Sequence, residues 1–188
     1  MVEEKKWLDE DRPTSKKTVA FSKGKFNLSE SFKPNSKISV YLSEIKDSLV
    51  SRRRFQIRIV DVRSPQEYTG EITSPPEYPT EHAQRPGHIP GAQNIPWAQV
   101  LNEDGTFKSA TELSDIYRSK DILPSNEVIT YCRIGERSSH SWFVLKYLLG
   151  YPDVKNYDGS WTEWGNLIGN PIEKEILLEA KTPISQTR

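Results

Sequence analysis

The chain contains one cysteine, Cys132, and the residues around it suit a reactive thiol. A short apolar run, 127–131, precedes the cysteine, and a helical pattern follows. A loop that leaves the carboxyl end of a parallel strand and enters a helix surrounds its residues with backbone N–H groups and the positive end of the helix dipole. With Arg133 and Arg137 nearby, this environment favours the thiolate, the nucleophilic form of cysteine. Gly135 permits the tight curl that turns successive N–H groups inward.

A lone cysteine at a strand end is more often a small buried apolar residue than a catalyst. The neighbours of Cys132 are two arginines, a glycine and a glutamate, which do not suit a buried apolar corner. We therefore interpret Cys132 as a candidate nucleophile. The candidate substrate-binding residues are Arg133, Ile134, Gly135, Glu136, Arg137 and Ser138.

Short runs rich in β-branched residues predict the strands that hold this loop. They are 55–62 and 127–131, and 154–157 can form one more. Asp61 and Arg63 lie at the carboxyl end of the first run, so we take them as supporting residues of the site. Strands that alternate with helical patterns predict an α/β fold with a central, mainly parallel sheet flanked by helices on both faces.

Helix signals lie between these runs. Ser64 and Ser109 are each followed three residues later by glutamate, which is the capping-box pattern of a helix start. The range 138–149 is helical in pattern, and Ser39 is the predicted N-cap of an earlier amphipathic helix. The side chains predicted to share one face of a last short helix are Trp161, Trp164, Leu167 and Ile168.

The length of 188 residues suits one domain with an extension, and 35% hydrophobic residues are enough for a packed core. Residues 1–37 are polar, lysine-rich and without sustained periodicity, so they are predicted to be an arm or linker. Residues 38–172 form the predicted domain, and 173–188 a C-terminal tail. The proline-rich range 71–87 predicts a long surface loop that borders a site.

Charge and composition argue against several classes of function. The 26 basic and 26 acidic residues balance, so no overall field favours nucleic acid or an anionic membrane. No apolar run is long enough for a membrane span or a signal-peptide core, and we expect a cytoplasmic protein. One cysteine cannot form an internal disulfide, and His82, His88 and His140 lack zinc-ligand spacing. We expect neither a metal nor a cofactor.

Four stretches, in order, resemble the motifs of rhodanese-type sulfurtransferases. The loop 132–139 is similar to the active-site loop of that family, 61–64 and 87–92 to two upstream signatures, and 157–161 to a terminal one. The resemblance extends from about Ser39 to Pro171. It is strongest to the catalytic, C-terminal domain of two-domain thiosulfate or 3-mercaptopyruvate sulfurtransferases, and it implies a rhodanese-like fold.

The resemblance implies that the Cys132 thiolate takes a sulfur atom from an anionic donor, holds it as a persulfide and passes it to cyanide or a thiol. Loop N–H groups would stabilise the persulfide, and Arg133 and Arg137 would hold the donor. An equally good role for Arg137 is structural, as an ion pair with Glu136 or Asp61. Many of those enzymes have an arginine, used for the donor's carboxylate or sulfonate, where this chain has Glu67. The loop also lacks the small residues after the cysteine that are typical of mercaptopyruvate enzymes, so we favour thiosulfate as the donor.

Three alternatives stay open. A phosphatase or arsenate reductase of the same fold also uses a cysteine followed by an arginine, but the spacing from Cys132 to Arg137 is shorter than those enzymes use. A protein-to-protein sulfur relay is compatible with the same loop. A non-catalytic binding module is the third alternative, but such modules commonly lack the cysteine.

A weak sequence similarity between the residues around Trp7 and those around Trp164 suggests that the chain begins where a related module would end. We therefore expect a separate, preceding rhodanese-like domain as a partner.

Histidine and tryptophan residues are further candidates for the site. His88, within a Gly-His-Ile-Pro-Gly turn, and His140 are interpreted as structural. Trp142 is predicted to lie in the core. For Trp97, Trp161 and Trp164, a place at a pocket mouth or a domain interface is predicted as readily as a place in the core.

Overall fold

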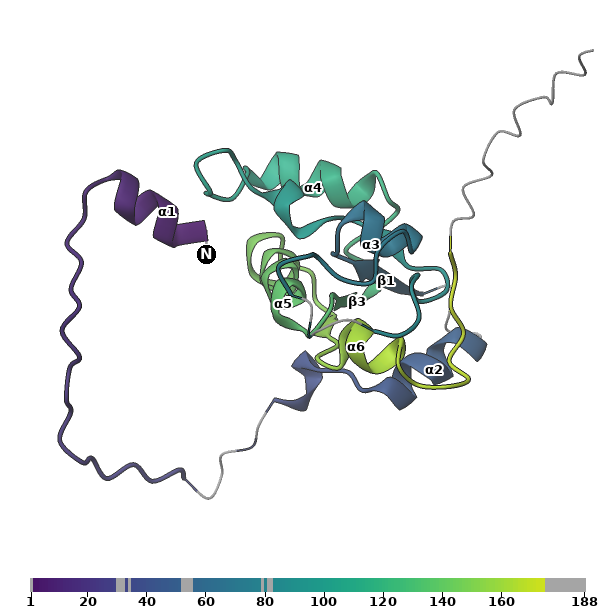
Figure 1. The fold of residues 1–188 in the computed structure, drawn as a ribbon, viewed down its shortest axis with the longest axis horizontal. Coiled ribbons are helices and arrows are strands. Elements are labelled where there is room, and N and C mark those ends of the chain that lie inside the picture. The colour runs from purple at the N-terminus through teal and green to yellow at the C-terminus, as the bar shows by residue number, and fades with distance from the viewer. Residues whose placement is uncertain are drawn as a thin grey trace, which may run out of the picture.

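The computed structural model describes residues 2–29, 33, 35–51, 56–78, 80 and 83–174 (Figure 1). The strands are β1 (Ile57–Asp61), β2 (Gln93–Asn94), β3 (Glu127–Tyr131) and β4 (Val154–Asn156). The α-helices are α1 (Val2–Asp9), α2 (Leu42–Val50), α3 (Pro65–Thr69), α4 (Ala110–Arg118), α5 (Glu136–Phe143) and α6 (Ser160–Trp164). Single turns add η1 (Ser36–Ile38), η3 (Trp97–Val100) and the π-helical η4 (Val144–Leu148).

The described strands form one parallel sheet in the order β2-β1-β3-β4, which confirms the predicted sheet. In the register of the two central strands, Asp61 lies opposite Tyr131. The chain therefore leaves β1 and β3 at the same edge of the sheet. Arg63 and Cys132, which follow these strands, are brought to that edge together.

Side chains alternate between the two faces of the sheet, as the two-residue period of a strand requires. On β3 and just after it, Val128 and Cys132 belong to one apolar cluster, whereas Ile129 and Tyr131 belong to a second. Helix α4 and turn η4 cover the first cluster, and α2 and α6 cover the second. The prediction of helices on both faces is confirmed.

Both predicted capping boxes are present and start helices on the expected residues. The Ser64 hydroxyl accepts a hydrogen bond from the Glu67 N–H at 3.2 Å, and the Ser109 hydroxyl accepts one from the Glu112 N–H at 3.4 Å. Each glutamate side chain returns to the backbone N–H of its serine. Local side-chain chemistry sets these two helix starts.

Two predicted helix starts were wrong. The N-cap of α2 is Tyr41, because the backbone of Ser39 is extended and bridges to Asn156 of β4. Helix α5 begins at Glu136, two residues earlier than expected, since Gly135 adopts the left-handed conformation and serves as the N-cap.

Of the four side chains predicted to share one face of the last helix, only Trp161 and Trp164 lie in that helix. Trp161 and Trp164 are fully buried, so they belong to the core and not to a pocket mouth. The helix ends at Trp164, and Ile168, beyond its end, is 99% exposed. Trp142 and Trp97 pack against the first apolar cluster, which confirms the prediction for Trp142.

Part of the predicted arm is helical. Helix α1 was not expected, and its Lys6 ammonium lies 3.8 Å from the Asp104 carboxylate of the domain. Residues 12–29 are extended and exposed, and they run clear of the domain (Figure 1). Phe55, His82 and residues 175–188 lie outside the described residues. Within the part that is described, no helix combines the length and the apolar character needed to cross a bilayer.

Candidate active site

The cysteine loop has the predicted place between β3 and α5. Cys132 directly follows the last residue of the strand, and Gly135 turns the chain into the helix with φ of +85°. A Cβ atom on Gly135 would lie 2.8 Å from the Cα of Asp158. Both the left-handed backbone and the close approach of the neighbouring segment therefore require glycine at this position.

The loop presents backbone donors without protein acceptors. Among the described residues, the N–H groups of Ile134 to Ser138 make no hydrogen bond, and the first bond of the helix runs from the Ser139 N–H to the Gly135 carbonyl. Such N–H groups at a helix start, together with the helix dipole, form a natural site for an anion. The sequence analysis predicted this arrangement for a loop between a parallel strand and a helix.

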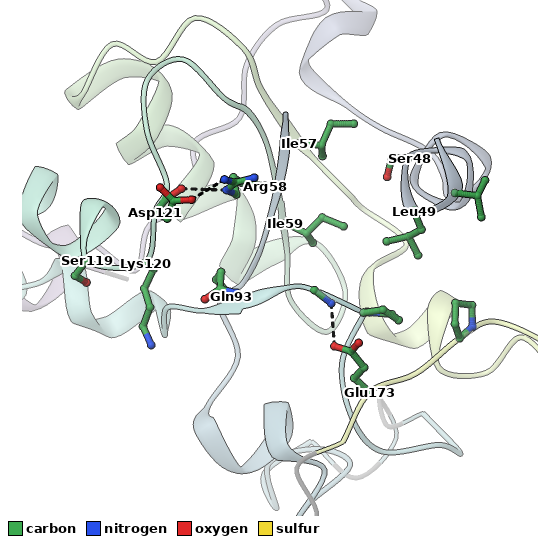
Figure 2. A pocket seen from close by; sticks show the side chains of 14 residues that line it. Ser48, Leu49, Ile57, Arg58, Ile59, Gln93, Ser119, Lys120, Asp121 and Glu173 are labelled. Atoms are coloured by element: carbon green, nitrogen blue, oxygen red, sulfur yellow. Dashed lines mark hydrogen bonds and ion pairs between the residues drawn. The ribbon is translucent and has the colours of Figure 1, made fainter. Parts of the chain in front are cut away.

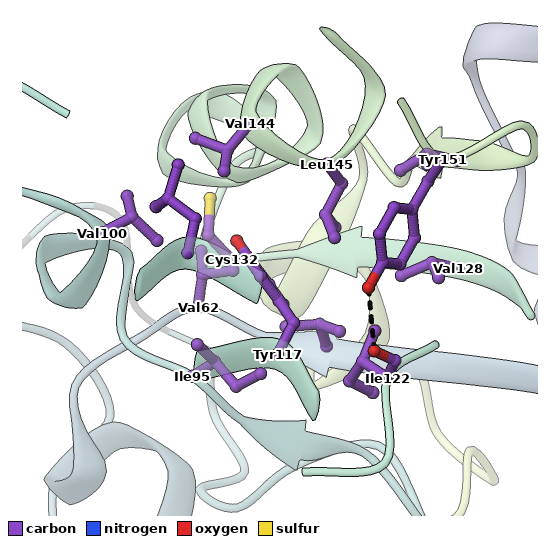
Figure 3. Close-up of a cluster of buried hydrophobic side chains, with 13 residues drawn as sticks. Val62, Ile95, Val100, Tyr117, Ile122, Val128, Cys132, Val144, Leu145 and Tyr151 are labelled. Atoms are coloured by element: carbon purple, nitrogen blue, oxygen red, sulfur yellow. Dashed lines mark hydrogen bonds between the residues drawn. The ribbon is translucent and has the colours of Figure 1, made fainter. Parts of the chain in front are cut away.

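Cys132 itself is fully buried and belongs to the same apolar cluster as Val62, Val100 and Val144 (Figure 3). Cys132, the candidate nucleophile, is therefore also a small buried residue of the core. A donor can reach the sulfur only when covering groups move.

Arg133 joins the cysteine loop to Tyr78 of the proline-rich range 71–87. The Arg133 side chain is 5% exposed, and its guanidinium carbon lies 4.2 Å from the centre of the Tyr78 ring, a cation–π contact. Tyr78 is half exposed and belongs to the proline-rich loop 71–87. The loop was predicted to border a site, but no sequence signal singled out Tyr78.

Arg137 is bound by Glu67 of α3. Its Nη1 donates to Oε2 and its Nη2 to Oε1, both at 2.9 Å, and the glutamate is fully buried. Burial alone would raise the pKa of Glu67, but Arg137 outweighs it and lowers that pKa below its usual value. The partners predicted from the sequence, Glu136 or Asp61, were both wrong, since Glu136 is exposed and Asp61 binds another arginine.

Asp61 and Arg63 form a buried ion pair beneath the loop, with 2.6 Å between Oδ2 and Nη2. The Tyr131 hydroxyl donates to the same carboxylate at 2.5 Å, and the Arg63 guanidinium lies 4.6 Å from the centre of the Trp161 ring. Burial alone would lower the pKa of Arg63, but Asp61 raises it. Burial and the Asp61 charge hold the pKa of Tyr131 well above its usual value. The supporting role predicted for Asp61 and Arg63 stays a prediction.

Ser138 and Ile134 complete the predicted loop. Ser138 is buried, and its hydroxyl donates to the Gly135 carbonyl, which steadies the turn into α5. Ile134 is 40% exposed, so it can meet a molecule that approaches from solvent. Within the described ranges, no group of three His, Cys, Asp or Glu side chains gathers in the way that metal ligands do.

Ser160 was missed as a site residue, although its motif was noted. Its hydroxyl accepts a hydrogen bond from the Cys132 N–H at 3.1 Å. The next two N–H groups, of Trp161 and Thr162, donate to the carbonyls of Cys132 and Arg133, each at 3.0 Å. The start of α6 is therefore bonded to the start of the cysteine loop.

The two described histidines make packing contacts that fit their structural interpretation. The His88 ring stacks on Tyr68 at 3.7 Å, and its Nδ1 lies 2.8 Å from the Tyr68 carbonyl oxygen. The His140 ring lies 5.0 Å from the Phe107 ring, and burial lowers its pKa.

A cavity of about 840 Å³ lies elsewhere, at the amino-terminal part of β1 and beside α2 (Figure 2). It is lined in part by Arg58, Asp121 and Glu173, and Arg58 and Asp121 neutralise each other in an ion pair of 2.6 Å. Cys132 does not line this cavity. The cavity therefore plays no part in the chemistry of the thiol.

Comparison with known proteins places this geometry in a family. The model of the rhodanese-like domain matches residues 42–167. The sulfur carrier protein TtuD of Thermus thermophilus is 53% identical over 169 residues, which are 90% of this chain and 58% of that protein. A protein of Mycolicibacterium smegmatis named "Putative thiosulfate sulfurtransferase" is 48% identical, with the same 90% and 58% covered.

A solved structure of EanB, described as a cysteine persulfide in a tetrahedral intermediate state with ergothioneine, is 30% identical. Its TM-score is 0.74, with 92% of this chain and 40% of that chain covered. The chain spans about 58% of the length of these two curated relatives.

Proposed function

The chain belongs to the rhodanese-like domain family, and from this premise we propose that it is a sulfurtransferase that carries sulfur as a persulfide on Cys132. The observation that carries the proposal is the row of N–H groups from Ile134 to Ser138, which have no protein acceptor among the described residues and directly follow the only cysteine. Oriented backbone donors stabilise an anion without any reorganisation during the reaction.

The proposed donor is thiosulfate. The Cys132 thiolate attacks the outer sulfur, the bond between the two sulfur atoms of thiosulfate breaks, and sulfite leaves with the electron pair. Arg133 supplies positive charge beside the thiol. Glu67 fixes Arg137 through two of its five N–H donors, so the charge and the remaining donors of the guanidinium are left to hold the anionic donor. Thiosulfate transfer is the activity in the name of the Mycolicibacterium relative.

The proposed acceptor is cyanide or a thiol. Cyanide attacks the terminal sulfur of the persulfide, thiocyanate leaves, and the Cys132 thiolate is restored. No metal or cofactor takes part in this double displacement. A thiol that must stay reduced between turnovers suits the cytoplasm, which is the compartment we propose.

Mass spectrometry of the intact protein tests the proposal. Incubation with thiosulfate is expected to add the mass of one sulfur atom, and the increase must lie on Cys132 because no other cysteine is present. Sulfate, a tetrahedral anion without a transferable sulfur, is the control donor and should add nothing. Cys132→Ser should abolish both the mass increase and thiocyanate formation. An unchanged mass with both thiosulfate and 3-mercaptopyruvate would contradict the proposal.

A second candidate is a protein-to-protein relay, which is favoured by the 53% identity to a protein named a sulfur carrier. The two candidates differ in the second half-reaction. A persulfide that forms readily but is released only slowly to cyanide and small thiols would favour the relay. Rapid release to small acceptors would favour the free-standing enzyme.

We also propose a separate, preceding rhodanese-like domain as partner, because the chain spans 58% of the length of its relatives. The exposed apolar side chains of the arm support this, with Phe21 at 88% and Phe26 at 84% exposure. Size-exclusion chromatography with the product of the upstream reading frame is the test. Absence of a complex, combined with full activity of the chain alone, would count against the partner.

A further inference from the structure

Ser160 has an unusual backbone conformation for its residue type. Its φ is +49°, in the left-handed region that costs free energy for any residue with a Cβ, and the residue is fully buried. Its neighbour Gly159 has an ordinary right-handed conformation. A strained serine beside an unstrained glycine indicates that the side chain at position 160 has a task that glycine cannot perform.

The Ser160 hydroxyl has both of its roles defined. It donates its single hydrogen to the Tyr157 carbonyl at 2.6 Å, so only a lone pair remains toward the Cys132 N–H at 3.1 Å. This bond fixes the amide of Cys132. The Trp161 and Thr162 N–H groups donate to the carbonyls of Cys132 and Arg133 and fix the next part of the loop.

A third carbonyl of the loop is held from the same direction. The Asn156 side-chain amide donates to the Gly135 carbonyl at 3.2 Å, and it is itself oriented by a 2.7 Å bond to Asp158. The carbonyls of Cys132, Arg133 and Gly135 are thus all bound by donors of the segment 156–162.

Because peptide bonds are planar, the bonds that hold these carbonyls also fix the direction of the N–H groups that follow them. In a trans peptide, the N–H points opposite to the carbonyl of the preceding residue. The N–H groups of Arg133, Ile134 and Glu136 therefore point away from the segment 156–162.

The sulfur lies on that far side. Trp161 and Tyr157 pack in the second apolar cluster, whereas the Cys132 side chain packs in the first cluster, on the opposite face of the sheet. Donors that point away from α6 thus point to the side on which the sulfur of Cys132 lies.

We infer that Ser160 is a positioning residue of the proposed sulfur transfer. Its hydroxyl fixes the amide of Cys132 at the start of the loop, whose carbonyls face α6 and whose N–H groups face the persulfide. The inference rests on the proposed function and adds to it the residue that anchors the start of the loop.

Two substitutions separate positioning from stability. Ser160→Gly removes the hydroxyl and also the strain, because glycine adopts a positive φ freely. The variant should therefore unfold at a higher urea concentration than Ser160→Ala, which loses the same two hydrogen bonds but keeps the strain. Its kcat for thiocyanate formation should fall about five- to tenfold, the effect of one lost hydrogen bond. The KM for thiosulfate should change less than about twofold, because the hydroxyl does not touch the donor. Ser160→Ala should show the same loss of kcat with lower stability.

Ser48→Ala is the matched control. The buried Ser48 hydroxyl also donates to a carbonyl three residues earlier, that of Ile45 at 2.7 Å, but it lies on α2. Its loss should lower stability and leave kcat unchanged. The inference about Ser160 would be overturned if Ser160→Gly kept the wild-type kcat. It would also be overturned if kcat fell in proportion to the free energy of unfolding in Ser160→Gly, Ser160→Ala and Ser48→Ala. Neither result would contradict the proposed function. A wild type that takes up no sulfur from any donor would overturn the proposed function as well.

Discussion

Glu67 and Arg137 face each other through two hydrogen bonds of 2.9 Å and join the helix after β1 to the helix after the cysteine. Glu67 is fully buried, and it also accepts hydrogen bonds from the Ser64 N–H and hydroxyl. One carboxylate thus caps its own helix and fixes the arginine of the active-site loop. The pair therefore fixes the position of the Arg137 guanidinium, which keeps further N–H donors beyond the two that Glu67 accepts.

Glu67→Gln is expected to destabilise the protein by about 3 kcal/mol, because it leaves the largely buried Arg137 without its counter-charge. Urea unfolding measures the change. The matched control is Glu112→Gln, at the same capping-box position of α4 but fully exposed and without an arginine partner. The free energy of unfolding should fall far less in Glu112→Gln than in Glu67→Gln. Equal losses in the two variants would mean that the capping bonds, and not the ion pair, matter.

The same pair predicts how stability depends on pH. Burial alone would raise the pKa of Glu67, but Arg137 lowers it below the ordinary value of 4.5. The stabilisation is therefore complete above 4.5 and is lost as the pH falls through the lower, folded-state pKa. The gap in unfolding free energy between wild type and Glu67→Gln should be constant near neutral pH and narrow below 4.5. A gap that does not change down to the acid transition would contradict the shift.

Tyr78→Ala should expose the buried thiol, because it removes the ring that covers the Arg133 guanidinium. We expect Cys132 to react with iodoacetamide about three- to tenfold faster than in the wild type, in line with the loss of one cation–π contact. The rate is followed by intact mass. Tyr147→Ala removes a tyrosine that is 63% exposed on η4 and should leave the rate unchanged. An unaltered rate in Tyr78→Ala would show that other groups control access.

Asp61→Asn should lower the free energy of unfolding by about 3 to 5 kcal/mol, because it leaves the Arg63 guanidinium buried without a counter-charge. Tyr131→Phe removes the hydrogen bond to the same carboxylate and the one that the tyrosine hydroxyl accepts from the Ile89 N–H, but it leaves the ion pair intact and should cost about 1 to 3 kcal/mol. Urea unfolding of both variants provides the comparison. A smaller loss in Asp61→Asn than in Tyr131→Phe would contradict a supporting role for the ion pair.

Several features of the molecule were determined by the sequence alone, because their causes are local. The runs that form β1 and β3 are rich in β-branched residues, and the capping boxes at Ser64 and Ser109 start helices through contacts across three residues. The order of these elements predicted a parallel sheet with the cysteine at the carboxyl end of a strand. The position of Cys132 in the fold followed from these patterns.

Only the tertiary structure decided which side chains meet at the loop. Glu67 and Arg137 are 70 residues apart in sequence, and Ser160 lies 28 residues beyond Cys132. Their pairing depends on the parallel register that brings the ends of β1, β3 and β4 together. No local pattern states which of several charged or hydroxyl groups will be nearest once those strands align. The sequence thus determined the place of Cys132, the proposed nucleophile, and long-range packing selected the groups around it.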